Sequence, residues 1–254
     1  MAELTITALA GMPQVQPGHD LAGLLIAALA ARGMVPRPHD VLVVTSKVVA
    51  KAEGRYRDLA TIVPSARAED IARRLDKDPR LVEAVLCEAA EVLRCGPNVL
   101  IVVTRHGLIM ANAGIDQSNL DPEDQGRRVL LLPEAPDRSA QGIKARLDAH
   151  FGVDIGVIVS DSVGRPWRLG TVGLAIGAAG VPALWDRRGE SDLAGRPLQA
   201  TEVAFADAVA SMAVLAMGEA AEGRPAARVR GLAWRAPARP AAALLRPRAE
   251  DLFR

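Results

Sequence analysis

Two apolar, β-branched runs of this 254-residue chain each lead into acidic, hydroxyl and amide residues. The runs, which we expect to form buried strands, are Val99–Thr104 continued by Leu108–Ala111, and Asp154–Val159. Asp116 and Asn119 follow the first run, and Asp161 and Ser162 follow the second. A carboxylate at a strand end, backed by hydroxyl and amide oxygens, suits a hard cation such as Mg²⁺ or Mn²⁺. The two loops therefore predict a shared metal site and metal-assisted chemistry on phosphates.

Simpler interpretations of these acidic residues stay open. Asp116 and Asn119 could form Asx turns that bond only their own backbone. Glu219, which follows a long apolar helix expected at about Thr201–Ala216, is a candidate third carboxylate for the metal site. The alternative is a glycine-terminated helix on which Glu219 and Glu222 are both solvated.

Four basic residues also follow expected strands. Lys47 and Lys51 come after an apolar run, and a helix there would place both on one face, where ammonium groups could neutralise polyphosphate charge. We assign Arg165 and Arg168, which follow the second acidic stretch, to carboxylate or phosphate groups of a substrate, because guanidinium groups bind both through paired hydrogen bonds. The alternative for each of the four is a solvated surface position.

Other features exclude several classes of protein. The chain has no GxxxxGK[ST] and no GxGxxG after a strand, so any nucleotide site is neither a P-loop nor a Rossmann turn. We expect Gly170, Gly173, Gly177 and Gly180 to allow close backbone packing instead. A net charge of +1 gives no case for nucleic acid or a membrane surface, and the longest apolar segment, Val172–Leu184, is too short to span a bilayer.

The two cysteines match no known metal or redox spacing. Cys87 and Cys95 occur in one apparently helical stretch, and they form neither a zinc motif nor a CxxC motif. We expect reduced, packed thiols in a cytoplasmic protein, since the N-terminus has no evident signal peptide.

The elements that must position the polar residues alternate between strands and helices, which predicts an α/β or mixed α+β fold. Expected strands are Leu4–Leu9, Val41–Val44, the two runs above, Val129–Leu132 and, more weakly, Ala227–Arg230. Expected helices span about Asp20–Arg32, 65–74, Arg80–Leu93, 139–152 and Thr201–Ala216, with Ser65 and Ser139 as N-caps. We expect one two-lobed region over 1–232, without a readable lobe boundary, and a Pro- and Arg-rich tail over 233–254. The tail could be an edge strand, a docking segment or partly disordered.

Five motifs in order resemble one family. They are Met12-Pro13, Ser46-Lys47 with Lys51-Ala-Glu-Gly54, the stretch from Ala111 through Asp116 to Asn119, Ser160 through Arg165, and Met217-Gly218-Glu219. Together they resemble the coenzyme F420-0:L-glutamate ligase family, also called the F420 γ-glutamyl ligase family. The resemblance extends from about residue 5 to residue 232.

The resemblance implies a fold, an activity and a set of site residues. Members of that family have a two-lobed α/β fold, form an intertwined homodimer, and add L-glutamate to coenzyme F420-0 with GTP and a divalent metal. Carried over by motif, the metal residues are Asp116, Asp161, Ser162 and Glu219. The implied GTP contacts are Met12, Pro13, Gln14, Val15, Ser46, Lys47, Lys51, Asn119, Met217, Gly218, Ala220, Ala221, Glu222, Gly223 and Arg224. The choice between Mg²⁺ and Mn²⁺, any need for K⁺, and the number of γ-linked glutamates added stay open.

This activity agrees with the chemistry that the residues suggest. Amide formation requires an activated carboxylate, most simply an acyl phosphate made from a nucleoside triphosphate, with Lys47 and Lys51 positioning the phosphates. Departures from the family pattern at His19, Gln117 and Glu222 leave the metal carboxylates intact. Two rival interpretations are a metal-dependent phosphotransferase or hydrolase that uses the same site on another acceptor, and a non-catalytic nucleotide-binding protein.

Overall fold

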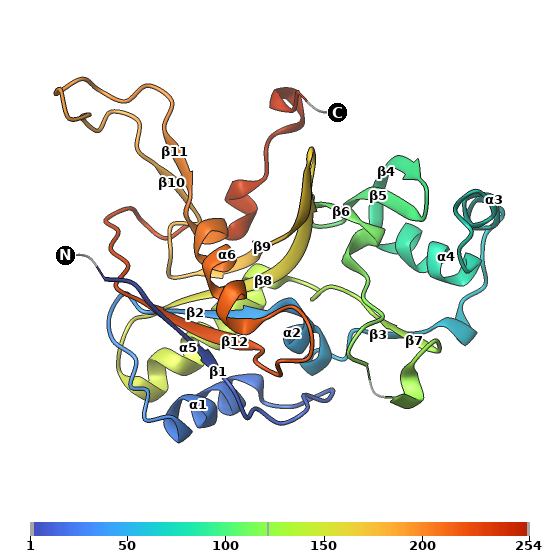
Figure 1. Ribbon diagram of the computed structural model, residues 1–254, viewed down its shortest axis with the longest axis horizontal. Helices are drawn as coiled ribbons and strands as arrows, with labels where there is room; N and C mark the ends of the chain where they lie inside the picture. Colours follow the sequence, from blue (N-terminus) through green and yellow to red (C-terminus); the bar gives the residue numbers. More distant parts are fainter. Residues whose placement is uncertain (1–2, 121, 253–254) are drawn as a thin grey trace.

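The computed structural model describes residues 3–120 and 122–252, and its main feature is a five-stranded sheet (Figure 1). The strand order is β1-β12-β2-β8-β9, with bounds Thr5–Leu9, Ala226–Arg230, Val41–Thr45, Gly156–Arg165 and Arg168–Ala179. Strands β2 and β8 are parallel, and the other neighbours are antiparallel. The predicted mixed α/β class is confirmed.

Helices cover both faces of this sheet. They are α1 (Leu21–Ala31) and α5 (Pro136–Phe151) on one face, and α6 (Phe205–Met217) on the other. Within β2, Leu42 and Val44 pack on the side of α1 and α5, whereas Val41 and Val43 pack on the side of α6. Successive side chains of a strand point to opposite faces, so an unbroken apolar run is the sequence pattern of a sheet that is buried on both sides.

Glycines in β9 allow the helices to approach the sheet closely. A Cβ atom at Gly173 would lie 2.5 Å from the carbonyl oxygen of Ala210 in α6, and one at Gly177 would lie 2.3 Å from that of Pro136 in α5. The packing role expected for these glycines and for Gly180 is confirmed. At Gly170 it is wrong, because that residue has open space around it and a φ of +87°, where the pairing of β8 and β9 is irregular near the hairpin tip.

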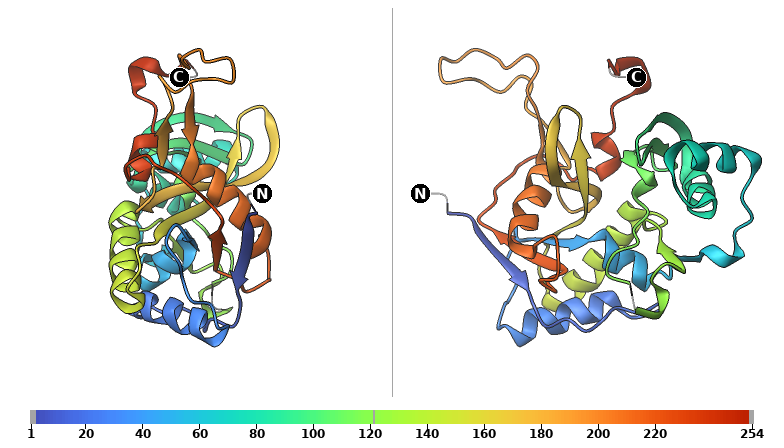
Figure 2. Two further views of the ribbon diagram at one scale, coloured as in Figure 1. Left: turned by 90° about the vertical axis from the view of Figure 1, so that its left-hand side faces the viewer. Right: turned by 45° about the vertical axis from the view of Figure 1, so that its right-hand side comes forward.

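A second group of elements lies beside the main sheet (Figure 1). It contains the sheet β4-β5-β6 (Ala89–Gly96, Val99–Thr104, Ile109–Ala111), on which α3 (Ala66–Leu75) and α4 (Pro79–Glu88) pack. The remaining elements are α2 (Ser46–Ala52), the pair β3 and β7 (Tyr56–Asp58, Arg128–Leu130), and the pair β10 and β11 (Leu184–Asp186, Glu202–Ala204). Figure 2 shows the β8–β9 hairpin and the loop after β10 extending away from the body.

The helix predicted at Arg80–Leu93 is wrong in its second half. Helix α4 ends at Glu88, and β4 begins at Ala89 and pairs antiparallel with β5. Ala, Glu and Leu favour helix locally, but pairing with the apolar β5 strand overrides that preference. Cys87 and Cys95 therefore lie in different elements; both are free thiols, and Cys87 is exposed rather than packed.

The second acidic stretch is not a loop. Strand β8 continues through Ser160, Asp161 and Ser162 to Arg165, because this whole segment pairs with β9 in a long hairpin. Polar residues usually end a strand, but here the apolar partner strand extends the ladder beyond the buried part of the sheet.

Two helix starts also differ from the prediction. Helix α5 begins at Pro136, whose fixed φ suits the first helical position, so Ser139 lies inside the helix and is not its N-cap. Helix α6 begins at Phe205 because 202–204 pairs with β10 as strand β11. The N-cap role of Ser65 is confirmed, since its side chain accepts a hydrogen bond from the Ala68 N–H.

The tail lies along the main sheet and reaches the second one. Arg239 forms backbone hydrogen bonds with Val181 and Ala183, and the Arg248 guanidinium pairs with Glu91 in β4 at 2.7 Å. Residues 1–2 and 253–254, at the outer ends of the predicted region and tail, lie outside the described residues. Within the described ranges, no helix has the length and apolar character needed to cross a membrane.

Candidate functional site

The register of the main sheet brings four chain segments to one end. Leu9 pairs with Ala226, Ala226 with Val44, and Val44 with Val159. The segments at this end are 10–15 after β1, 217–225 before β12, the start of α2 after β2, and 160–162 in β8. Ligands of open α/β sheets commonly bind beyond the carboxyl ends of parallel strands, which is where β2 delivers Ser46.

Ser46 and Asp161 meet across the parallel pair β2 and β8. Thr45, which pairs with Ser160, is the N-cap of α2, and the Ser46 hydroxyl donates to Asp161 Oδ1 at 2.7 Å. Burial raises the pKa of the Asp161 carboxyl to about 6, although hydrogen bonds from Ser46 and from the Ser162 N–H oppose that rise. The charge of Asp116 raises it further, so the two carboxylates are near enough to repel one another.

Asp116 and Lys47 form an ion pair that includes Ser118. Lys47 Nζ lies 2.6 Å from Asp116 Oδ2 and donates to Ser118 Oγ at 2.9 Å, and the Ser118 N–H donates to Asp116 Oδ1 at 2.7 Å. Burial alone would raise the pKa of Asp116, but the bonds from Lys47 and Ser118 outweigh it, and the pKa is lowered. The Asx turn that we kept as the simpler interpretation of Asp116 is present, together with the contact to Lys47.

The segment that carries both lysines is helical and forms α2, which is the condition under which Lys47 and Lys51 share one face. Lys51, which is 6% exposed, donates from Nζ to the backbone oxygen of Asn119 at 2.7 Å. Both lysines thus contact the segment 116–119, which precedes β7. These contacts join the main sheet to the segment that holds Asp116.

Glu219 and Ser162 form the third pairing at this end. The Ser162 hydroxyl lies 2.8 and 2.7 Å from the two carboxylate oxygens of Glu219. In the same loop, the Ala220 N–H donates to Glu222 Oε2 at 2.8 Å and lowers the pKa of Glu222.

Of the N-terminal residues expected to contact nucleotide, Val15 is buried, whereas Pro13 and Gln14 are exposed.

The predicted residues do not all come together. Within 3–120 and 122–252, no group of three or more His, Cys, Asp or Glu side chains is close enough to hold a metal ion. Each of the three candidate carboxylates is instead bonded to a donor of the chain. Arg165 and Arg168 pair at the tip of the β8–β9 hairpin, and Arg165 lies four positions after Asp161 along β8, which corresponds to about 13 Å.

The donor set nevertheless suits a divalent cation. Asp161 is a largely desolvated carboxylate whose described contacts include no cationic side chain at hydrogen-bond distance, and it lies close enough to Asp116 for their charges to interact. Carboxylate and hydroxyl oxygens are the ligands that Mg²⁺ and Mn²⁺ prefer. A cation between Asp116 and Asp161 would offset their repulsion.

Ser118 is a residue of this site that the sequence did not indicate. Its hydroxyl accepts from Lys47 and its N–H donates to Asp116, so one residue contacts both members of the ion pair. The Asp-Gln-Ser spacing is the signal that an Asx turn leaves, but only the fold brings Lys47 to that turn.

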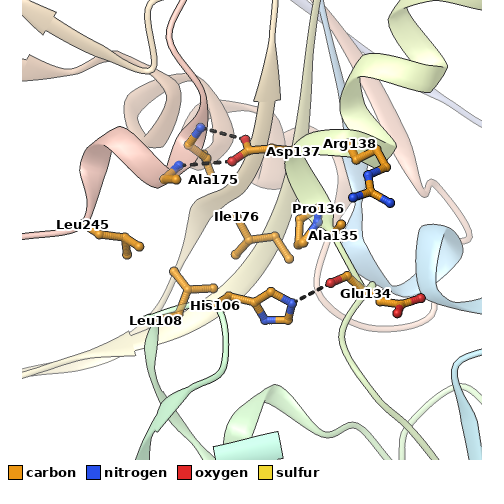
Figure 3. Close-up of a pocket in the computed structure, with 12 residues that line it drawn as sticks. His106, Leu108, Glu134, Ala135, Pro136, Asp137, Arg138, Ala175, Ile176 and Leu245 are labelled. Carbon is orange, nitrogen blue, oxygen red and sulfur yellow. Dashed lines mark hydrogen bonds between the residues drawn. The ribbon is translucent and has the colours of Figure 1, made fainter. Parts of the chain in front are cut away.

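A cavity of about 240 Å³ lies elsewhere, under the C-terminal tail (Figure 3). It is lined by residues of α5, β9, the turn after β5 and the tail, among them His106, Asp137 and Leu245. None of the residues predicted for the metal or the nucleotide lines it.

The fold and the site define a class of protein. It is a mixed α/β protein with carboxylates, lysines and hydroxyls gathered at one end of its parallel strands β2 and β8. The sequence profile of the family described as F420-0:Gamma-glutamyl ligase matches residues 11–231. This chain belongs to that family, as the resemblance of its motifs indicated.

Named relatives agree with this assignment. The coenzyme F420:L-glutamate ligase of Methanothermobacter thermautotrophicus is 45% identical over 99% of both chains. That of Methanopyrus kandleri is 47% identical over 95% of this chain and 94% of the relative. That of Methanocaldococcus jannaschii is 44% identical over 85% of this chain and 84% of the relative.

Proposed function

We propose that this protein is a ligase that adds L-glutamate to coenzyme F420-0 in the biosynthesis of coenzyme F420, using GTP and a divalent metal ion, Mg²⁺ or Mn²⁺. Family membership supports the ligase and its two substrates. One observation supports the site most directly. The neighbouring residues Ser46 and Lys47 contact Asp161 and Asp116, respectively, and so bring the two carboxylates together at one end of the main sheet.

The reaction has two steps. A carboxylate oxygen of coenzyme F420-0 attacks the γ-phosphorus of GTP. A new P–O bond forms, the bond from the γ-phosphorus to the β,γ-bridging oxygen breaks, and GDP leaves. The amine of L-glutamate then attacks the carbon of the acyl phosphate, loses a proton and expels phosphate. The chain needs no covalent nucleophile for either step, and its contribution is to position the reactants and offset charge.

Lysines and backbone groups at the end of the sheet bind the nucleotide in this proposal. Lys47 and Lys51 on α2 contact phosphate oxygens, and Lys51 acts in catalysis by stabilising charge on the transferred group. Ser46, Asn119 and the loops 12–15 and 217–224 supply the remaining contacts, since all of them come from segments beside α2.

Asp116, Asp161, Ser162 and Glu219 would hold the metal ion, which supplies positive charge for the phosphate groups. Arg165 and Arg168 bind carboxylate or phosphate groups of the acceptor, which requires that the acceptor extend along the β8–β9 hairpin. K⁺ is a further ion to test in the assay.

The two-lobed homodimer of the family is part of the same proposal, as is a cytoplasmic location. Trp167 and Leu169, at the tip of the hairpin, are 81% and 99% exposed, and exposed apolar side chains next to one another are typical of contact surfaces. Light scattering should give twice the 26.8 kDa mass of one chain. A mass of one chain at all concentrations would contradict the dimer.

Substitution of the metal carboxylates tests the proposed site. We expect Asp116→Asn and Asp161→Asn to lower glutamate incorporation by at least about 100-fold while the circular dichroism spectrum stays unchanged, because an amide is neutral and a weak ligand for a hard cation. Asp70→Asn, on the exposed surface of α3, is the matched control and should retain full activity. Full activity of both site variants would show that Asp116 and Asp161 do not bind a metal ion needed for the reaction.

A further inference from the structure

Lys47 occupies the place beside Asp116 that a metal ion would take. Its Nζ atom lies 2.6 Å from Asp116 Oδ2, and both side chains are partly buried, with exposed fractions of 27% and 30%. The proposed function assigns Asp116 to the metal and Lys47 to the phosphates of GTP. A metal ion at Asp116 Oδ2 would compete with the Lys47 ammonium for that oxygen.

Ser118 holds the Lys47 ammonium at this position through its hydroxyl, at 2.9 Å, and it also holds Asp116 through its N–H, at 2.7 Å. The backbone of Asp116 is fixed independently by two backbone hydrogen bonds with Leu130, each 2.9 Å long. An ammonium group has several N–H donors on a flexible stem, so Lys47 can turn while Asp116 stays in place.

We propose that Lys47 is an exchangeable counter-ion, which neutralises Asp116 while no divalent ion is bound and turns to the phosphates of the nucleotide when the ion takes its place. Ser118 is the positioning residue that keeps the ammonium between the two partners. This inference rests on the proposed function, because it requires a metal and a nucleotide at this end of the sheet.

The charges favour such an exchange. Without a divalent ion, Asp116 and Asp161 repel one another, and the positive charge of Lys47 lowers the pKa of both carboxyls. A divalent ion brings more positive charge to the same oxygens, so Lys47 is no longer needed there, and a triphosphate offers it new anionic acceptors nearby. Metal and nucleotide binding should therefore support each other through Lys47.

The exchange predicts opposite effects of one substitution on two ligands. In Lys47→Met, we expect Mn²⁺ alone to bind about threefold to tenfold more tightly, because the ion no longer competes with the ammonium for Asp116. The non-hydrolysable GTP analogue GMP-PNP, added with saturating Mn²⁺, should bind about tenfold more weakly, because a phosphate contact is lost. Titration calorimetry with each ligand measures both affinities without turnover.

A second variant and a control make the test specific. Ser118→Ala keeps the backbone N–H to Asp116 but removes the hydroxyl bond to Lys47, so GMP-PNP should bind about threefold to tenfold more weakly while Mn²⁺ alone binds at least as tightly as to wild type. Lys77→Met, in the linker between α3 and α4, removes the same charge elsewhere and should change neither affinity.

Several results would overturn the inference. Weaker or unchanged Mn²⁺ binding in Lys47→Met would mean that Lys47 does not compete with the ion. An unchanged GMP-PNP affinity in both Lys47→Met and Ser118→Ala would mean that Lys47 does not turn to the phosphates of the nucleotide. A wild-type protein that binds neither Mn²⁺ nor GMP-PNP would contradict the inference and the proposed function together. Opposite shifts in a protein that makes no glutamylated product would support the exchange and contradict only the ligase.

Discussion

The environment of Asp161 disfavours its charged form and so opposes folding. Its pKa of about 6 means that burial and the charge of Asp116 disfavour the ionised form, and the Ser46 hydroxyl offsets only part of that cost. Side chains with strongly shifted pKa values concentrate at functional sites, because a binding site needs groups that are not already neutralised. In the proposed function, the further partner of Asp161 is a divalent ion.

The sign of this shift predicts how stability depends on pH. Below about pH 4 the carboxyl is protonated in both the folded and the unfolded chain. Between about 4 and 6 the folded chain keeps a proton that the unfolded chain has lost, so the contribution of Asp161 to the free energy of unfolding falls as pH rises, and the loss is complete above about 6.

We expect Asp161→Asn to stabilise the metal-free protein by up to about 3 kcal/mol at pH 8, with a difference from wild type that shrinks towards pH 4. Urea denaturation of both proteins at pH 4, 5, 6, 7 and 8 measures it. A variant that is less stable than wild type at pH 8, or a difference that does not depend on pH, would contradict the account of Asp161.

At the residue scale, the sequence indicated the candidate site residues, but it did not indicate which of them contact one another. Asp116 and Asp161 were predicted as partners, and the structure brings them near each other. The bond between Lys47 and Asp116 was not predicted, because it joins residues far apart in the chain. Arg165 lies at the hairpin tip, since β8 continues as a strand where a loop was expected.

At the scale of elements, the glycines of β9 determine how closely the helices pack. We expect Gly177→Ala to destabilise the protein by about 2–4 kcal/mol, because the new Cβ would clash with backbone atoms of Pro136 and Asp137 that cannot move alone. Gly142→Ala, inside α5 with open space around it, is the matched control and should stabilise by about 0.5–1 kcal/mol. Thermal denaturation compares the two; equal effects would mean that the close approach is unimportant.

Elements with a consistent local pattern were predictable, and elements formed by pairing were not. The buried strand β2 and helix α1 match their predictions within about a residue, since apolar runs, the Asp20 cap and Gly33 all agree locally. Strand β4 and the outer half of β8 were missed, because their strand conformation depends on β5 and β9.

At the scale of the whole molecule, the tail joins parts that are far apart in the chain. Asp137 at the start of α5 accepts hydrogen bonds from the N–H groups of Ala178 in β9 and of Ala241 and Ala242 in the tail, at 2.8, 2.8 and 3.3 Å. Figure 3 shows the two bonds from the tail. Beyond this point, Arg248 reaches Glu91 in the second sheet. One carboxylate thus fastens the tail to the main sheet.

We expect Asp137→Ala to lower the free energy of unfolding by about 2–4 kcal/mol, because it leaves several backbone donors without their acceptor. Asp70→Ala, which loses only exposed ion pairs on α3, should change it by less than about 0.5 kcal/mol. Urea denaturation of the full chain measures both. Equal stabilities of the two variants would show that the tail is not fastened through Asp137.

The composition of the tail did not indicate this arrangement. A Pro- and Arg-rich segment has no periodic apolar pattern, so the sequence left an edge strand, a docking segment and disorder as alternatives. Its docking depends on an acceptor more than a hundred residues away, which no local pattern encodes.

The most direct test of the account is mass spectrometry of a reaction that contains the purified protein, coenzyme F420-0, L-glutamate, GTP and Mn²⁺. We predict a product heavier by one or more glutamyl units, formed with one GDP for each unit, and no product with Asp161→Asn. GTP consumption without any glutamylated product would contradict the ligase and favour a phosphotransferase or hydrolase acting on another molecule.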